Sequence, residues 1–216
     1  MSFEPDRCLV NWKFPMRAVF TEREVPASGE LRVAAGSIVT AAAADLARQR
    51  GVKIIELKAG EEPGLAPPDK TVAIGADHGG FGMKEALRPV FGELGLAVRD
   101  VGIYEEKAVD YPDIACAVSQ LVASGAATRG VILDAAGIGS AMAANKVAGI
   151  RAAPCYDLAS ARNSREHNDA NVLTLGGRLL TVSQAEAVLR TWLGAKFAGG
   201  RHQARVDKIM EIEKRR

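Results

Sequence analysis

Five short apolar stretches, each followed by a segment with helical spacing, alternate along this 216-residue chain from residue 71 onward. The apolar stretches are TVAIGA, LAVRDVG, RGVILDA, GIRAAP and NVLTLGG. Between them, Ile114, Val118, Leu121 and Val122 have the spacing of a single helix face. Strands alternating with helices predict an α/β fold with a parallel sheet covered by helices on both faces.

The chain before this pattern is predicted to be a separate appendage. Residues 59–70 contain three prolines and two glycines and have no periodicity, as in a linker. Upstream, the sequence predicts a strand near residue 31, a helix capped by Thr40 and ended by Gly51, and a strand from Val52. We therefore expect an N-terminal α/β appendage with its linker at 1–69 and a main domain at 70–216. The appendage contains no histidine, which favours a role in interaction or assembly over catalysis.

Composition excludes several classes of function. The net charge is only +2, so no overall positive charge attracts nucleic acid or an anionic membrane. No apolar stretch approaches the roughly 18 residues that a membrane span requires, and the N-terminus lacks the pattern of a secretory signal. Three cysteines at irregular spacing indicate reduced thiols, with neither a disulfide framework nor a zinc site. These features predict a cytoplasmic protein.

Polar side chains gather in the segments that end the predicted strands, where parallel sheets bind their ligands. All three histidines lie in these segments or near the C-terminus. Singly, a histidine is more often a packing residue, an arginine pair four residues apart is usually a solvated face, and a glycine loop is often a tight turn. Their coincidence favours a site. The candidates are Asp77, His78, Asp134, His167, Arg178, Arg201 and Arg205.

Five motifs along residues 70–210 resemble those of the family of ribose-5-phosphate isomerase B and galactose-6-phosphate isomerase. They are GADHGGFGMK, VDYPD, GIGSAMAANKVAGIRAA, SREHNDANVLTLGGR and GGRHQARVDKI. The resemblance implies a Rossmann-like three-layer α/β/α sandwich with a five-stranded parallel sheet. It also implies a homodimer or homotetramer whose active sites are shared between subunits. Such enzymes interconvert an aldose phosphate and a ketose phosphate, without a metal or an organic cofactor.

The same resemblance implies a role for each candidate residue. His167 would assist opening of the sugar ring, and Asn168 would help to stabilise the enediolate together with the backbone N–H groups around Gly137, Ile138 and Gly139. Asp77 and Tyr111 match positions that line the sugar pocket. The phosphate would be held, in part from the neighbouring subunit, by His78, Arg178, Arg201 and Arg205. His202 is expected to be structural and lies outside the predicted site.

Asp134 occupies the position of the catalytic base. The commonest members of the family have a cysteine there, in CGTGIG, and a second branch has a glutamate where this chain has Ser140. The motif LDAAGIGS is closest to IDAFGAGS of the galactose-6-phosphate isomerase A subunit. An ionised aspartate is a weak base at neutral pH unless desolvation strengthens it. We therefore predict that Asp134 moves the proton; the alternative is that it only caps the following helix.

Two further functional interpretations remain open. In the first, the chain is one subunit of a heteromeric sugar-phosphate isomerase, although the pair Asp77–His78 replaces the Asp-Glu of that A subunit. The other interpretation is a non-catalytic sensor that binds a sugar phosphate, with the appendage as its effector arm. Substrates of four, five or six carbons all fit the motifs. Ala136 stands where the common motif has a threonine that assists ring opening, which favours short or open-chain substrates.

Overall fold

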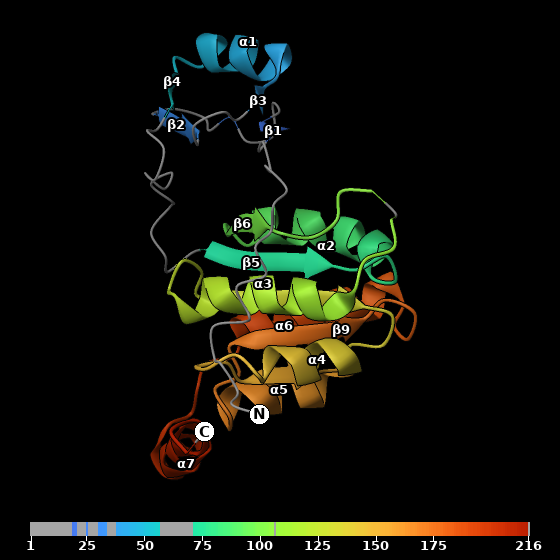
Figure 1. Ribbon diagram of the computed structural model, residues 1–216, viewed down its shortest axis with the longest axis vertical. Coiled ribbons are helices and arrows are strands. Elements are labelled where there is room, and N and C mark those ends of the chain that lie inside the picture. Colours follow the sequence, from blue (N-terminus) through green and yellow to red (C-terminus); the bar gives the residue numbers. More distant parts are fainter. Residues whose placement is uncertain are drawn as a thin grey trace, which may run out of the picture. The chain divides into compact units, whose positions relative to one another are not determined.

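The computed structural model of the chain describes residues 19–20, 25, 30–33, 38–56, 71–105 and 107–215 (Figure 1). The chain divides into two compact units, Met1–Leu65 and Ala66–Arg216. The boundary between the units falls inside the predicted linker, whose residues 59–70 lie outside the described part. Within the part that is described, no helix is both long and apolar enough to cross a bilayer.

The described residues of the smaller unit form two pairs of parallel strands and one helix. Its strands are β1 (Val19–Phe20), β2 (Glu30–Val33), β3 (Ile38–Val39) and β4 (Lys53–Glu56), paired as β1–β3 and β2–β4. Helix α1 (Ala41–Gln49) begins after Thr40, whose hydroxyl accepts a hydrogen bond from the Ala43 N–H at 3.2 Å. Gly51 follows the helix with a φ of +66°. Apolar side chains that include Leu31, Ala43 and Val52 form its core.

The larger unit is built on a five-stranded sheet in which every pair of neighbours is parallel. The strands are β5 (Thr71–Ala76), β6 (Ala97–Asp100), β7 (Arg129–Asp134), β8 (Ala152–Pro154) and β9 (Val172–Gly176). Their order is β6-β5-β7-β9-β8. Strands β5, β7 and β9 are buried almost along their full length, which explains why their sequences are continuous apolar runs.

Helices cover both faces of this sheet, which confirms the predicted three-layer sandwich. The helices are α2 (Phe81–Glu93), α3 (Tyr111–Ala123), α4 (Ile138–Ala144), α5 (Leu158–Glu166), α6 (Val182–Gly194) and α7 (Gln203–Glu213). One core contains Leu87 of α2, Ala161 of α5 and Trp192 of α6, and the other contains Val118 of α3 and Ala144 of α4. Helices α2, α5 and α6 therefore pack on one face, and α3 and α4 on the other.

Candidate active site

Asp134 is the last residue of β7, and its carboxylate is enclosed by the turn that follows. One oxygen, Oδ1, accepts hydrogen bonds from the N–H groups of Ala136, at 2.8 Å, and of Gly137. The other, Oδ2, accepts from the Ser140 N–H at 3.0 Å and from the Ser140 hydroxyl at 2.5 Å. The Asp134 side chain is only 4% exposed. The carboxylate thus satisfies the unpaired N–H groups at the start of α4, as the capping interpretation expects.

The glycines of this turn have steric causes. Gly137 has a φ of +79°, a conformation that residues with a Cβ rarely adopt. A Cβ on Gly139 would lie 2.6 Å from ring atoms of Tyr111, the first residue of α3. The Tyr111 ring therefore rests directly on the turn, and its side chain is 41% exposed. Gly139 is what allows that close approach.

Two further strands contribute polar residues at the same edge of the sheet. Asp77 directly follows β5 and is 5% exposed, and its Oδ1 accepts hydrogen bonds from the Gly79 and Gly80 N–H groups at 2.8 and 3.0 Å. The next residue, His78, is exposed. Arg178 follows β9, where its N–H donates to the Ala135 carbonyl at 3.0 Å. We call this group the carboxyl-end set: Asp77, His78, Tyr111, Asp134, Gly137, Ile138, Gly139 and Arg178.

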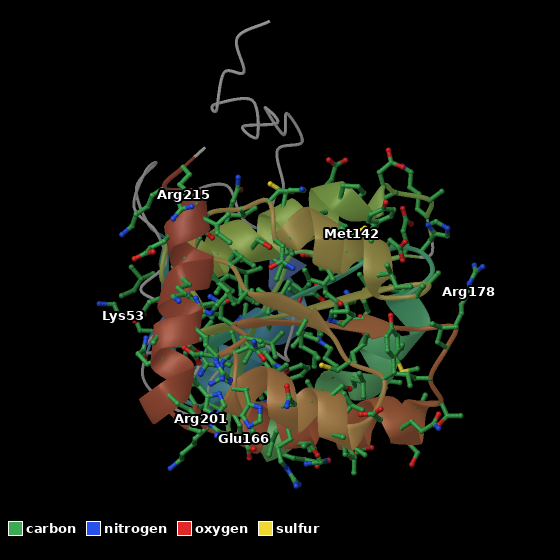
Figure 2. The ribbon with its side chains drawn as sticks, turned by 90° about the horizontal axis from the view of Figure 1, so that it is seen from below. Lys53, Met142, Glu166, Arg178, Arg201 and Arg215 are labelled. Atoms are coloured by element: carbon green, nitrogen blue, oxygen red, sulfur yellow. The ribbon has the colours of Figure 1, made fainter. Side chains whose placement is uncertain are left out.

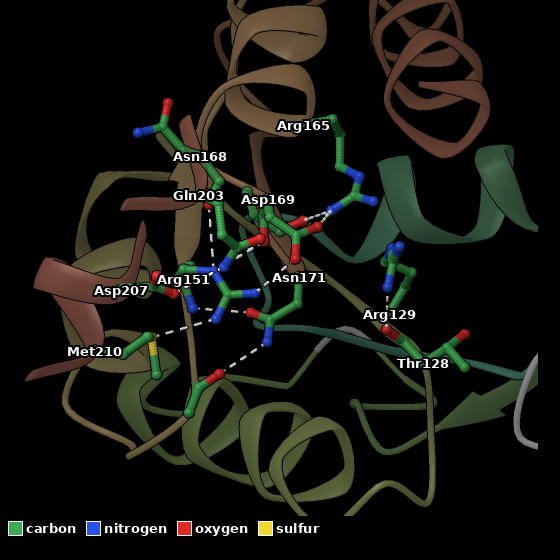
Figure 3. Close-up of polar contacts among 12 residues, drawn as sticks. Thr128, Arg129, Arg151, Arg165, Asn168, Asp169, Asn171, Gln203, Asp207 and Met210 are labelled. Carbon is green, nitrogen blue, oxygen red and sulfur yellow. Dashed lines mark hydrogen bonds and ion pairs between the residues drawn. The ribbon is translucent and has the colours of Figure 1, made fainter. Parts of the chain in front are cut away.

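The remaining predicted residues lie at the opposite edge of the sheet. Helix α5 starts beyond the carboxyl end of β8 and runs back, so His167, which caps its C-terminus, lies near the amino ends of the strands. The Asn168 carbonyl accepts a hydrogen bond from Arg151 Nε at 3.2 Å, and Arg151 directly precedes β8 (Figure 3). We call this group the amino-end set: His167, Asn168, Arg201 and Arg205.

A stack of two imidazole rings joins α7 to this edge of the sheet. The rings of His167 and His202 are 4.2 Å apart between centroids and almost parallel, at 4°. The stack brings the 3-10 turn Gly200–His202, and with it Arg201, beside His167. Burial lowers the pKa of the His202 imidazole, and the charges of His167, Arg201 and Arg205 lower it further. Both effects favour the neutral form of the His202 imidazole, which packs against His167.

The arginines of both sets carry charge that no carboxylate in the described part of the chain neutralises. Arg178, Arg201 and Arg205 are all exposed. Among the residues that the structure describes, none of these three arginines forms an ion pair with a carboxylate. By contrast, Arg151 and Arg165 are both paired with Asp169. Unpaired guanidinium groups are suited to binding a phosphate dianion.

A hollow of about 280 Å³ lies beside the amino-end set. It is lined by side chains that include Asn145, Arg151, Ser164, Asn168 and Ile209. In the described part of the chain, no cluster of three or more histidine, cysteine, aspartate and glutamate side chains is placed to bind a metal ion. The polar groups that face this hollow are amides, a hydroxyl and a guanidinium, which are hydrogen-bonding groups.

The two sets do not meet within one chain. Strand β7 has six residues, and a strand of that length spans about 17 Å. Figure 2 shows Arg178 and Arg201 on opposite sides of the domain. A single chain therefore does not bring all the predicted site residues together. The carboxyl-end set and the amino-end set are two separate half-sites.

Sequence reasoning missed two residues beside Asp134. Ser140 is fully buried, and its hydroxyl and N–H both contact the Asp134 carboxylate. Tyr156 lies beyond the carboxyl end of β8, and its hydroxyl donates to the Ala136 carbonyl at 2.9 Å. The signal for Tyr156 was its place two residues after a predicted strand, close to the position that Asp77 has after its own strand. No spacing rule in the sequence connects Tyr156 with a turn that lies 20 residues upstream.

Known proteins that are similar to this chain match its larger unit. The family model described as Ribose/Galactose Isomerase matches residues 72–209. Ribose-5-phosphate isomerase B of Escherichia coli is 43% identical over 147 residues, which is 68% of this chain and 99% of that protein. D-erythrulose-4-phosphate isomerase of Pectobacterium atrosepticum is 37% identical, over 64% of this chain and 92% of that protein. The structure of Clostridium thermocellum ribose-5-phosphate isomerase B superposes with a TM-score of 0.66 at 46% identity, covering 67% of this chain and 98% of that one.

Proposed function

This chain belongs to the ribose/galactose isomerase family, and we propose from that premise that it is an aldose–ketose isomerase acting on a phosphorylated sugar. The observation that carries the proposal is the pair of half-sites. One holds a carboxylate beside a glycine turn, and the other holds an imidazole, an amide and two unpaired guanidinium groups. Together they supply a base, hydrogen-bond donors for an enediolate and cations for a phosphate.

We propose that the enzyme is a homodimer, alone or within a tetramer, in which each active site combines the carboxyl-end set of one chain with the amino-end set of its partner. Exposed apolar side chains next to both sets support this assembly. Ile138 and Met142 of α4 are 48% and 64% exposed, and Ile209 and Ile212 of α7 are 41% and 54% exposed. A two-fold axis that pairs these surfaces creates two equivalent sites in one step.

Asp134 acts as the base in this proposal, through its Oδ2 atom. Oδ1 is held by two backbone N–H groups, which have fixed directions, whereas the shortest contact of Oδ2 is to the Ser140 hydroxyl. A hydroxyl hydrogen rotates freely. When the Ser140 O–H turns away from Asp134, a lone pair of Oδ2 becomes available. That lone pair takes the proton from C2 of the open-chain aldose, and an enediolate forms. The hydroxyl proton on the C2 oxygen passes to the C1 oxygen, and return of the carbon-bound proton from Asp134 to C1 yields the ketose.

The other residues bind and orient the sugar phosphate. Arg201 and Arg205 of the partner chain, with Arg178 and His78, hold the phosphate. His167 exchanges a proton with the ring oxygen during ring opening, and Asn168 donates to an oxygen of the enediolate. Asp77 and Tyr111 border the sugar. The Gly137 N–H is already bonded to Asp134, which leaves the N–H groups of Ile138 and Gly139 as backbone donors to the enediolate.

Removing Arg205 is expected to weaken binding of the phosphate without disturbing the fold. Arg205→Ala removes a charge-assisted contact, so the KM for a sugar phosphate should rise at least about tenfold. Steady-state kinetics measures this. Lys214→Ala is the control, because Lys214 is also exposed and directly follows α7, nine residues after Arg205 and on the opposite side of the helix axis. An unchanged KM for Arg205→Ala would remove this residue from the site.

Assays with four-, five- and six-carbon aldose phosphates, followed by NMR, test the function itself. Conversion of any of them to its ketose by the purified chain supports the isomerase. Turnover that appears only after a second protein is added would support the heteromeric enzyme, and binding without turnover would support the sensor.

A cytoplasmic location is also part of the proposal, supported by the irregular spacing of the three cysteines.

A further inference from the structure

Tyr156 is a feature of the carboxyl-end half-site that the proposed mechanism does not use. Its backbone is held firmly at the end of β8. The neighbouring Cys155 N–H donates to the Thr174 carbonyl at 3.2 Å. On the other side, Asp157 caps α5 by accepting a hydrogen bond from the Ser160 N–H at 2.7 Å. Because Tyr156 lies between a strand end and a capped helix, the backbone fixes the position of its Cα atom and the direction of its Cα–Cβ bond.

From that origin the Tyr156 side chain reaches across the carboxyl edge of the sheet. Strand β9 lies between β8 and β7 in the sheet order. Tyr156 nevertheless touches the turn after β7, where its hydroxyl donates to the Ala136 carbonyl at 2.9 Å. The phenol therefore lies over the end of β9, two residues before Arg178 in the chain. With 37% of its surface exposed, the side chain is open to solvent on one side.

The turn that holds Asp134 is thus contacted by two partly exposed phenols. Tyr156 contacts it at Ala136, and the Tyr111 ring rests on Gly139. Tyrosine presents an apolar ring and one polar tip, which suits the C–H and O–H groups of a sugar. Because Tyr111 comes from α3 and Tyr156 from the end of β8, the two rings approach the turn from different elements.

The hydroxyl of Tyr156 is a neutral donor under working conditions. Burial raises the pKa of the Tyr156 phenol, and the negative charge of Asp134 raises it further. The group therefore keeps its proton well above neutral pH. Its single hydrogen rests on the Ala136 carbonyl, and this O–H rotates towards a new acceptor at little cost. An uncharged donor suits a sugar hydroxyl or carbonyl oxygen, whereas the arginines suit the phosphate.

We propose that Tyr156 is a substrate-binding residue of this enzyme, whose ring borders the sugar and whose hydroxyl donates a hydrogen bond to a sugar oxygen. The inference rests on the proposed function, since it assigns the residue to the same site. Within that site it separates two tasks: Tyr156 contacts the carbon chain, and the arginines contact the phosphate. Loss of the hydroxyl should therefore weaken binding of a sugar phosphate and leave binding of inorganic phosphate unchanged.

Phosphorus NMR titrations of the full chain with ribose 5-phosphate and with inorganic phosphate test this. For Tyr156→Phe, the Kd for ribose 5-phosphate should rise about three- to tenfold, and the Kd for inorganic phosphate should stay the same. Tyr104→Phe is the matched control, because the Tyr104 hydroxyl also donates to a backbone carbonyl, that of Asp100, at 2.9 Å. Both of its Kd values should equal those of the parent.

Two results would overturn the inference. Unchanged binding of ribose 5-phosphate by Tyr156→Phe would show that the hydroxyl does not touch the sugar. An equal loss of affinity for both ligands would show that the phenol only holds the turn in place. Isomerisation by the parent protein is measured separately. If the parent binds ribose 5-phosphate but isomerises no sugar phosphate, the proposed function fails, while the two titrations still decide the role of Tyr156.

Discussion

Asp134→Asn is expected to lower turnover by roughly 10²–10⁴-fold, the usual contribution of a general base. The amide keeps the size of the carboxylate but cannot take a proton from carbon. Its nitrogen also cannot accept a hydrogen bond, so it loses either the contact with the Gly137 N–H or that with the Ser140 N–H. Exchange of solvent deuterium into the substrate, followed by NMR, measures the proton-transfer step directly.

Ser140→Ala is the control that separates catalysis from capping. This variant keeps the carboxylate and its backbone N–H partners but removes the hydroxyl that bonds to Oδ2. A carboxylate that loses a hydrogen bond to its charged form becomes a stronger base. Deuterium exchange by Ser140→Ala should therefore remain within about threefold of the parent or exceed it, because a lost neutral hydrogen bond has an effect of that size.

The pair of variants gives different patterns under the two interpretations of Asp134. If Asp134 is the base, Asp134→Asn lowers the exchange rate by roughly 10²–10⁴-fold and Ser140→Ala preserves it. If Asp134 is only a cap, both variants lower the melting temperature and neither changes the exchange rate per folded molecule. Thermal unfolding by circular dichroism supplies the second measurement. Exchange by a folded Asp134→Asn protein at the parental rate would refute the base and favour the subunit or the sensor.

The fold was predictable because its signals are local. Strands β5, β7 and β9 are buried on both faces, and such strands are continuous apolar runs in the sequence. Val118 and Val122 of α3 recur at a helical period because both are buried against the sheet. The order of the strands was not predictable in the same way. It places β7 between β5 and β9, and that choice depends on how the helices pack rather than on any one segment.

The carboxyl-end residues were predictable for the same reason, whereas their partners across the site were not. Asp77, Asp134 and Arg178 lie at or within two residues of the ends of apolar strands, so their place at the carboxyl edge can be read from the strand pattern. His167 ends a helix that returns to the amino edge, and Arg201 lies beyond the last strand altogether. The hydrogen bonds of the Asp134 carboxylate were hidden as well, because Ser140 gives no signal that its hydroxyl turns inward.

Because the two half-sites are separate, the shared active site can be tested by mixing two inactive variants. We expect activity to return in the mixture, which is the second large effect. Asp134→Asn damages only the carboxyl-end set, and Arg201→Ala combined with Arg205→Ala damages only the amino-end set. Each protein alone contains one defect in every shared site and should show little activity at substrate concentrations near the parental KM. In a mixed dimer, one site collects both defects and the other receives the undamaged set from each chain.

Co-expression of the two variants in equal amounts should therefore restore activity to about a quarter of the parental value, since half of the dimers are mixed and each mixed dimer has one intact site. Restoration has a simple physical cause: Asp134 at the end of β7 and Arg201 beside His167 lie at opposite edges of one sheet, so only a second chain can bring them together. When the mixture is diluted below the dissociation constant of the dimer, the activity should disappear as monomers form. Light scattering follows the appearance of monomers. Mass spectrometry checks that mixed dimers are present. If they are present and the activity stays at the level of the separate variants, each chain completes its own site. In that case α7 would have to move to the carboxyl edge of the sheet.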